Sequence, residues 1–73
     1  MAIWISLNDT SNLAPVTDAF FSVTYHNEGS GNYYVYVDPN QEFWVDSPEY
    51  KVQYANSDSY TYMQISLTKD IWP

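Results

Sequence analysis

The sequence predicts an all-β fold, a small antiparallel meander of five to six strands that forms a compact barrel or sandwich. Large apolar residues alternate in steps of two at 2–7, 33–38 and 42–46, which is the side-chain period of a strand. Segments rich in Gly, Pro, Asn, Asp and Ser separate the runs and predict turns. No extended apolar repeat of 3.6 residues exists, so we expect no long helix. The 73 residues suffice for one core, so residues 1–73 are expected to form a single small all-β domain.

Six strands are expected in chain order. Their predicted bounds are 2–7, 19–26, 33–38, 42–46, 50–55 and 59–67. The loop at 27–32 contains both glycines, and Asp38–Gln41 has Asp, Pro and Asn in the order that a type I turn prefers. The one long connection spans residues 8–18. Pro15 and several capping residues there allow at most one short helical turn around residues 12–18.

The first and last strands carry matching apolar faces. Ile5-Ser6-Leu7 near the start of the chain is echoed by Ile65-Ser66-Leu67 near its end. Equivalent inward faces predict that these two strands lie side by side and bring the termini together. Two large apolar residues within segment 71–73 are expected to pack against the end of the fold.

The alternation also predicts a central hairpin around Pro39, because cross-strand neighbours share a face. A three-residue loop pairs Val37 with Phe43 and Tyr36 with Trp44, whereas a two-residue loop would mix the faces. With the preceding hairpin, this register gives one inner face: Phe21, Val23, Tyr25, Val35, Val37, Phe43 and Val45.

The flanking strands fit this scheme unequally. The preceding hairpin is expected to pair Tyr25 with Tyr33, which keeps its apolar residues on the inner face. Joining 50–55 to the last strand would send Val52 to the opposite side from Met63 and Ile65. Two alternatives stay open: the fifth strand crosses to another sheet, or both faces of the last hairpin are covered.

The charge restricts the classes of partner. Nine acidic residues stand against two lysines and no arginine, which gives a formal net charge of −7. Nucleic-acid binding depends on Lys and Arg that neutralise phosphates, so we expect no direct nucleic-acid binding and no anionic membrane partner. Charge of one sign steers association, so a basic protein surface is the expected partner, with solubility as the plainer explanation of the charge.

Other chemistry is sparse. The chain has no cysteine, no visible signal peptide and no apolar run of transmembrane length, so we expect a soluble cytoplasmic protein. His26 is the only histidine, and no serine stands in a nucleophile motif, so we expect no enzyme and no catalytic residue. Oxygen ligands around Asp38 and Asp58 do not match a calcium-binding loop, so neither a metal nor a cofactor is expected.

The candidate partner-binding site is one face of the central hairpin. Its members stand at alternate positions: Tyr34, Tyr36, Asp38, Glu42, Trp44 and Asp46. The preferred register places Asp38 opposite Glu42, and like charges in that position destabilise a sheet, which is a reason to suspect function. Tyr and Trp are also favoured at protein interfaces. The alternative is that Tyr36 and Trp44 form the core, but carboxylates without basic partners are costly to bury.

We therefore expect a small acidic binding protein that docks this face on a basic protein surface. One concrete form is an inhibitor that mimics a nucleic acid, with carboxylates where phosphates would bind. Acidic chains of this size are common among phage-encoded inhibitors of host defence systems, a likeness that carries no motif. Two alternatives stay open. One is a carbohydrate-binding module with Trp and Tyr platforms, and the other is a self-assembling subunit that pairs strand edges in a homodimer.

Overall fold

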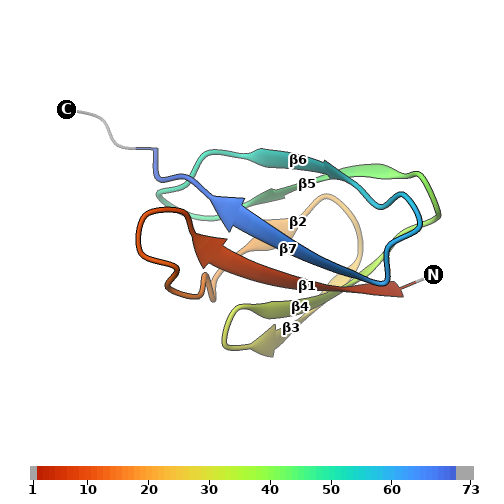
Figure 1. Ribbon diagram of the computed structural model, residues 1–73, viewed down its shortest axis with the longest axis horizontal. Coiled ribbons are helices and arrows are strands. Elements are labelled where there is room, and N and C mark those ends of the chain that lie inside the picture. The colour runs from red at the N-terminus through yellow and green to blue at the C-terminus, as the bar shows by residue number, and fades with distance from the viewer. Residues whose placement is uncertain (1, 71–73) are drawn as a thin grey trace.

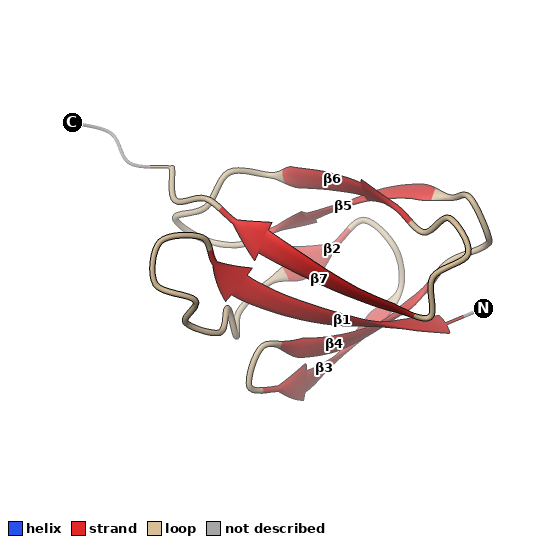
Figure 2. Ribbon diagram, viewed as in Figure 1, coloured by secondary structure: helices blue, strands red, loops and turns tan. Residues whose placement is uncertain are grey.

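The computed structural model describes residues 2–70, which contain seven strands and no helix (Figures 1 and 2). The strands are β1 (Ala2–Asp9), β2 (Phe20–Phe21), β3 (Tyr25–Gly29), β4 (Asn32–Tyr36), β5 (Glu42–Asp46), β6 (Gln53–Asn56) and β7 (Tyr62–Leu67). They form a four-stranded sheet in the order β3-β4-β1-β7 and a three-stranded sheet in the order β2-β5-β6. The all-β prediction is confirmed, while the meander is wrong and the sheets do not close into a barrel. The packing predicted for 71–73 lies outside the described residues.

The two sheets face each other across one shared core. In β1, the buried Ile3, Ile5 and Leu7 alternate with the more exposed Trp4 and Ser6, as a period of two requires. The buried apolar side chains come from both sheets and from the segment that joins β1 to β2: Ile3, Ile5, Leu7, Val16, Ala19, Phe21, Tyr33, Val35, Val37, Phe43, Val45, Ile65 and Leu67. Within β1, β4, β5 and β7 the alternation therefore predicted correctly which residues point inward.

β1 and β7 are neighbours, as their matching faces predicted, but they run parallel. Leu7 lies opposite Ile65, and Ile5 lies opposite Met63. Because the strands are parallel, the start of β1 and the end of β7 lie at opposite ends of the molecule (Figure 1). The prediction that the termini meet is therefore wrong.

The predicted central hairpin is also wrong, because β4 and β5 belong to different sheets. β4 pairs with β1 and β3, whereas β5 pairs with β2 and β6. The chain crosses between the sheets at Asp38–Gln41. Ser57, which is completely buried, holds this crossing: its Oγ donates to the Asp38 carbonyl at 2.6 Å and accepts from the Gln41 amide at 2.9 Å.

The expected strand at 19–26 is likewise divided between the sheets, as β2 and β3. Ser22 marks the division: its amide donates to the Trp44 carbonyl at 3.0 Å, and its Oγ accepts from the Trp44 amide at 3.0 Å. The fifth expected strand, now β6, lies in the other sheet from β7. Of the two alternatives for that strand, the crossing to a second sheet is confirmed.

β3 and β4 form a hairpin, with a register two residues away from the predicted one. Tyr25 lies opposite Val35 instead of Tyr33. A shift of two residues keeps every side chain on its face, which is why the inner face was still predicted correctly. The turn has positive φ at Ser30 and Gly31, with φ of 54° and 82°.

The long connection after β1 contains no helix; the sequence allowed at most one short helical turn around residues 12–18. It is held as a loop by side chains that bond to nearby backbone. The Asn12 Oδ1 accepts from the Ala14 amide at 2.9 Å, and the Ala14 carbonyl accepts from the Asp9 amide at 2.9 Å. Leu13 between them has a φ of 60°, outside the helical region.

Candidate functional site

Five of the six predicted site residues lie on two surfaces that point in opposite directions. Tyr34 and Tyr36 are on the outer side of the four-stranded sheet, whereas Glu42, Trp44 and Asp46 are on the outer side of the three-stranded sheet. The sixth residue, Asp38, is exposed in the crossing between the sheets. The grouping of all six on one hairpin face is wrong, since that hairpin does not exist.

The three-stranded face consists of Phe20, Glu42, Trp44, Asp46 and Tyr54. Trp44 is partly buried, and Phe20 meets it edge to face with ring centroids 6.1 Å apart and an interplanar angle of 84°. Tyr54 lies opposite Trp44 on β6 and is 60% exposed. Glu42 and Asp46 flank Trp44 along β5, so two carboxylates border an aromatic centre.

Glu42 has a different neighbour from the predicted one. Asn56 lies opposite it on β6, so the expected opposition of Asp38 and Glu42 does not occur. A carboxylate beside an amide carries no penalty for like charge. The opposition of like charges, which was one reason to suspect function here, is therefore absent. The aromatic and acidic composition of the face is the reason that still holds.

The four-stranded face carries an aromatic row that sequence reasoning did not assemble. One rung crosses all four strands: His26 lies opposite Tyr34, Tyr34 opposite Trp4, and Trp4 opposite Tyr62. The Trp4 and Tyr34 rings are 4.8 Å apart between centroids. Tyr36 extends the row, with its ring 5.7 Å from that of Tyr34. Trp4 points away from the core on β1, and only the order of the strands shows which residues lie beside it.

The next rungs of this face are polar and uncharged. Asn32 and Gln64 lie opposite Ser6 on its two sides, and Ser66 lies opposite Asn8. The Ser66 Oγ donates to the Asn8 Oδ1 at 2.7 Å. This face therefore combines an aromatic rung with amides and hydroxyls, while the three-stranded face combines aromatic rings with carboxylates.

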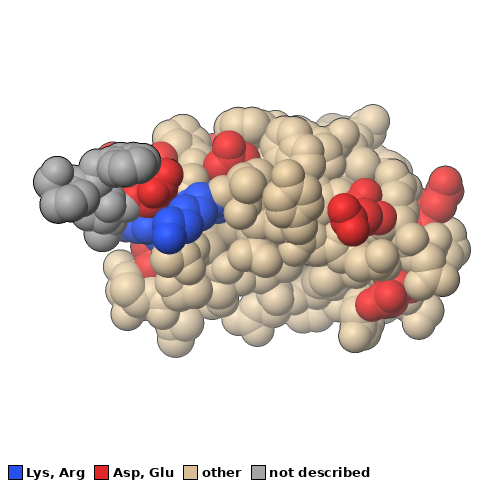
Figure 3. Space-filling view, turned by 90° about the horizontal axis from the view of Figure 1, so that it is seen from above, with Lys and Arg blue, Asp and Glu red and all other residues tan. Residues whose placement is uncertain are grey.

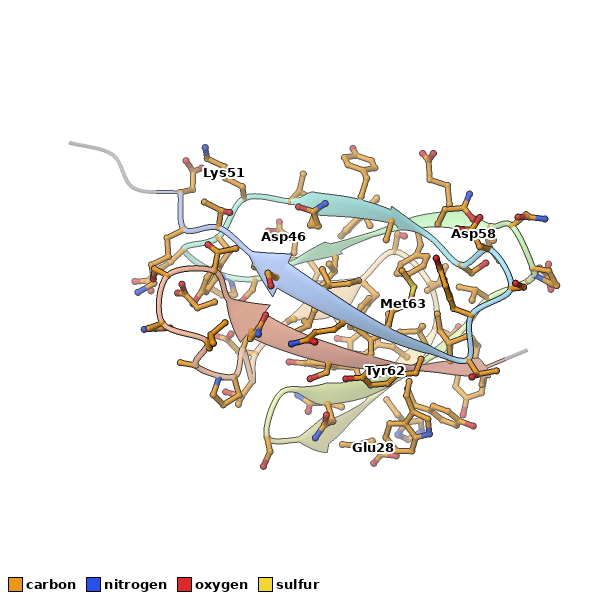
Figure 4. The ribbon with its side chains drawn as sticks, viewed as in Figure 1. Glu28, Asp46, Lys51, Asp58, Tyr62 and Met63 are labelled. Carbon is orange, nitrogen blue, oxygen red and sulfur yellow. The ribbon has the colours of Figure 1, made fainter. Side chains whose placement is uncertain are left out.

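The two lysines lie together at one end of the molecule, whereas carboxylates lie toward both ends (Figure 3). Lys51 and Lys69 lie close together in the chain fold. The Lys51 amide donates to the Thr68 carbonyl, and the neighbouring Tyr50 and Lys69 form an isolated antiparallel β-bridge. Seen from above, the lysines gather at one end with several carboxylates around them, and separate carboxylates lie toward the other end (Figure 3). Asp58 lies toward that second end (Figure 4).

The segments that carry Asp38, Glu42 and Asp58 are held together. The Asn40 amide donates to the Asp58 carbonyl at 2.9 Å, the Ser57 hydroxyl donates to the Asp38 carbonyl, and Asn56 lies opposite Glu42. The end of the molecule away from the lysines is therefore acidic.

Asp9 is a buried carboxylate that sequence reasoning overlooked. It is 2% exposed, and its Oδ1 accepts from the Ser11 amide at 2.7 Å and the Ser11 hydroxyl at 2.6 Å. Its Oδ2 accepts from the Tyr50 hydroxyl at 2.8 Å. These bonds favour the charged form and lower the Asp9 pKa to about 2, while the bond to Asp9 raises the pKa of Tyr50 to about 12. The Asp-Thr-Ser sequence, which is typical of a side-chain-capped turn, was the available signal.

The Asp9 carboxylate should make stability depend on acid. Its pKa is 3.8 without these bonds and about 2 in the fold, so its contribution is complete above pH 3.8 and is lost as the pH falls toward 2. In Asp9→Asn we expect lower stability at pH 7 and a flatter dependence between pH 4 and 2. Urea unfolding across that range measures both. The exposed Asp58→Asn is the matched control, and an unchanged acid slope in Asp9→Asn would contradict the assignment.

Residues 2–70 offer few other chemical features. They contain no group of three or more His, Asp or Glu side chains arranged to hold a metal ion. No helix in this range has the length and apolar character to cross a membrane. His26 is exposed at the edge of the four-stranded sheet. Comparisons with protein-family models, curated proteins and solved structures find no match for this chain.

Proposed function

We propose that the chain is a small acidic binding protein that docks its three-stranded face on a basic protein surface. The supporting observation is Trp44 between Glu42 and Asp46, with Phe20 and Tyr54 beside it. A half-buried tryptophan supplies apolar contact area in a fixed orientation, which is typical of an interface hot spot. The flanking carboxylates complement arginine and lysine on the partner.

An inhibitor of a nucleic-acid-binding protein is the concrete form of this proposal. Such a target has a basic groove, where arginines make paired hydrogen bonds to phosphate or carboxylate oxygens. In this proposal Asp38, Glu42 and Asp46 take the place of phosphates, and Asp58 adds a further carboxylate at the acidic end. Trp44 adds apolar contact beside them. Tyr34 and Tyr36 are not part of this interface, because they lie on the other side of the molecule.

The charge requirement is tested with a partner captured from host lysate at low salt. We expect a basic protein, and we expect the triple variant Asp38→Asn, Glu42→Gln, Asp46→Asn to bind it about tenfold more weakly, because exposed ion pairs contribute up to about 1 kcal/mol each. Calorimetry at two salt concentrations measures the affinity and its salt dependence. The control triple Glu28→Gln, Glu49→Gln, Asp70→Asn removes equal charge elsewhere. Equal affinity of both triples would refute the proposal.

An uncharged carbohydrate is the second candidate, and the aromatic rung of the four-stranded face favours it. Apolar faces of sugar rings rest on Trp and Tyr, and Ser6 and Gln64 on the next rung offer hydrogen bonds to hydroxyls. Trp4→Ala and Trp44→Ala distinguish the candidates, because the two tryptophans lie on opposite faces. Loss of basic-protein binding in Trp44→Ala alone supports the first candidate. Salt-independent oligosaccharide binding that is lost in Trp4→Ala alone supports the second.

A further inference from the structure

The four sheet edges differ in how well they resist pairing with another strand. Exposed edges are normally protected by charge, proline, a bulge or short length. β2 has two residues, β6 has four, and β3 carries Glu28 and a bulge between Asn27 and Gly29. β7 has six residues, Tyr62–Leu67, with no charged residue and no proline, and its register with β1 is continuous. β7 is thus the one described edge strand that lacks these protections.

The backbone groups on the free side of β7 can be assigned from the bonds on its other side. The Trp4 amide donates to the Thr61 carbonyl and the Thr10 amide to the Leu67 carbonyl, both at 3.0 Å. Since successive residues of a strand direct their backbone groups to alternate sides, Met63 and Ile65 also face β1. The amides and carbonyls of Tyr62, Gln64 and Ser66 therefore face away from it.

The open part of this edge is well defined. Beyond β7 the Thr68 carbonyl accepts from the Lys51 amide at 2.8 Å, so segment 49–51 occupies the edge there. Toward the start of the strand, a hollow of about 290 Å³ is lined by Tyr60, Tyr62, Met63 and Gln64. In Figure 4, Met63 lies between the two sheets, and Tyr62 lies on the other side of β7. The space beside Tyr62 and Gln64 is therefore open to a further strand.

We propose that β7 pairs with β7 of a second copy of this chain, antiparallel and centred on Gln64. In this register Tyr62 lies opposite the partner's Ser66, and Gln64 lies opposite its own copy. Each of these pairs exchanges both backbone hydrogen bonds, so all free groups of the edge are used. On the inner side, the partly buried Met63 meets the partner's Ile65, and the two cores become continuous.

A second copy fits this edge because the edge is uncharged and complementary to itself in the antiparallel register. Two chains that each carry −7 repel one another, so they can associate only through a neutral contact. β7 contains none of the nine carboxylates and neither lysine. A neutral amide at the symmetry axis can lie opposite itself, whereas an acidic side chain there would be repelled. The edge also uses none of the residues of the three-stranded face, so the dimer is independent of the proposed function.

Sedimentation equilibrium over a range of protein concentration tests the proposal. We expect the wild-type mass to rise from one chain toward two, and to do so at lower concentration in high salt, which screens repulsion. Gln64→Glu places like charges across the axis, and Gln64→Pro removes the central edge amide at a position where an edge tolerates proline. Both variants should weaken the dimer at least tenfold while near-ultraviolet circular dichroism stays native.

The control Asn12→Asp adds the same charge in an exposed loop and should dimerise like the wild type. A wild-type chain that remains a monomer at millimolar concentration, or Gln64 variants that dimerise normally, would overturn the pairing. The outcome is separate from that for the proposed function. Basic-protein binding weakens with salt and survives Gln64→Glu, whereas self-pairing strengthens with salt and survives the triple variant of Asp38, Glu42 and Asp46.

Discussion

Replacing Gly31 with alanine should cost about 3 kcal/mol of stability, a large part of the roughly 4 to 11 kcal/mol expected for a domain of this size. Gly31 has a φ of 82°, which penalises any residue with a Cβ by about 1 to 2 kcal/mol. A Cβ there would also lie 2.8 Å from the Leu7 carbonyl oxygen and 2.8 Å from the Pro15 Cβ. Such overpacking typically costs about 1 to 3 kcal/mol.

Neither neighbour of Gly31 can easily move away. Leu7 is held within β1: its amide donates to the Gly31 carbonyl at 2.8 Å, and its carbonyl accepts from the Val16 amide at 3.2 Å. Pro15 forms an isolated antiparallel β-bridge with Asn8, the residue after Leu7. Gly31 thus lies where the neighbour of β1 changes from β4 to residues 15–16.

Gly29→Ala is the matched control. Its φ is 86°, but a Cβ at that position would have nothing within 4 Å. We expect Gly29→Ala to cost only the backbone penalty of about 1 to 2 kcal/mol. Chemical denaturation of the three proteins measures the difference, which should be about 2 kcal/mol in favour of Gly29→Ala. Equal losses in the two variants would show that the close approach contributes nothing.

Alternation predicted the inward side of β1, β4, β5 and β7, but it did not predict the sheet to which each strand belongs. Val35 on β4 and Phe43 on β5 are both buried, and the sequence pattern around them is the same. Two sheets that face one another present equivalent inner faces, so period alone cannot separate a hairpin from a crossing. The contact that distinguishes the crossing from a hairpin is made by Ser57, whose buried hydroxyl bonds to the backbone of Asp38 and Gln41. That contact becomes visible only in three dimensions.

The same ambiguity between a hairpin and a crossing explains why only part of the candidate site was predicted correctly. Trp44, Glu42 and Asp46 were placed together correctly because they alternate along a single strand. Tyr36 was assigned to the same surface only through the hairpin, and it lies on the opposite side of the molecule. Spacing along the sequence was therefore sufficient to group residues of one strand on a surface, but insufficient to group residues of different strands. The parallel pairing of β1 with β7 joins distant parts of the chain, so the Trp4–Tyr62 rung had no local signal.

Tyr33→Phe should be the second large loss, about 2 to 4 kcal/mol, although only one oxygen atom is removed. Tyr33 is fully buried, and its hydroxyl donates to the Val16 carbonyl at 2.8 Å and accepts from the Ala19 amide at 3.0 Å. Both Val16 and Ala19 are themselves buried, so water cannot replace the lost partner. The same burial raises the pKa of the Tyr33 hydroxyl, which keeps it protonated as a donor.

The effect of Tyr33→Phe should be local as well as global, because the hydroxyl joins the loop before β2 to the inner face of β4. Hydrogen exchange should show faster exchange of the Ala19 amide than the loss of global stability alone explains. Tyr36→Phe removes a hydroxyl from a side chain that is 45% exposed, and it should change stability by less than about 0.5 kcal/mol. If Tyr33→Phe behaves like Tyr36→Phe in denaturation and exchange, the buried hydroxyl does not hold this loop, and packing of the Tyr33 ring against Phe21 accounts for its position.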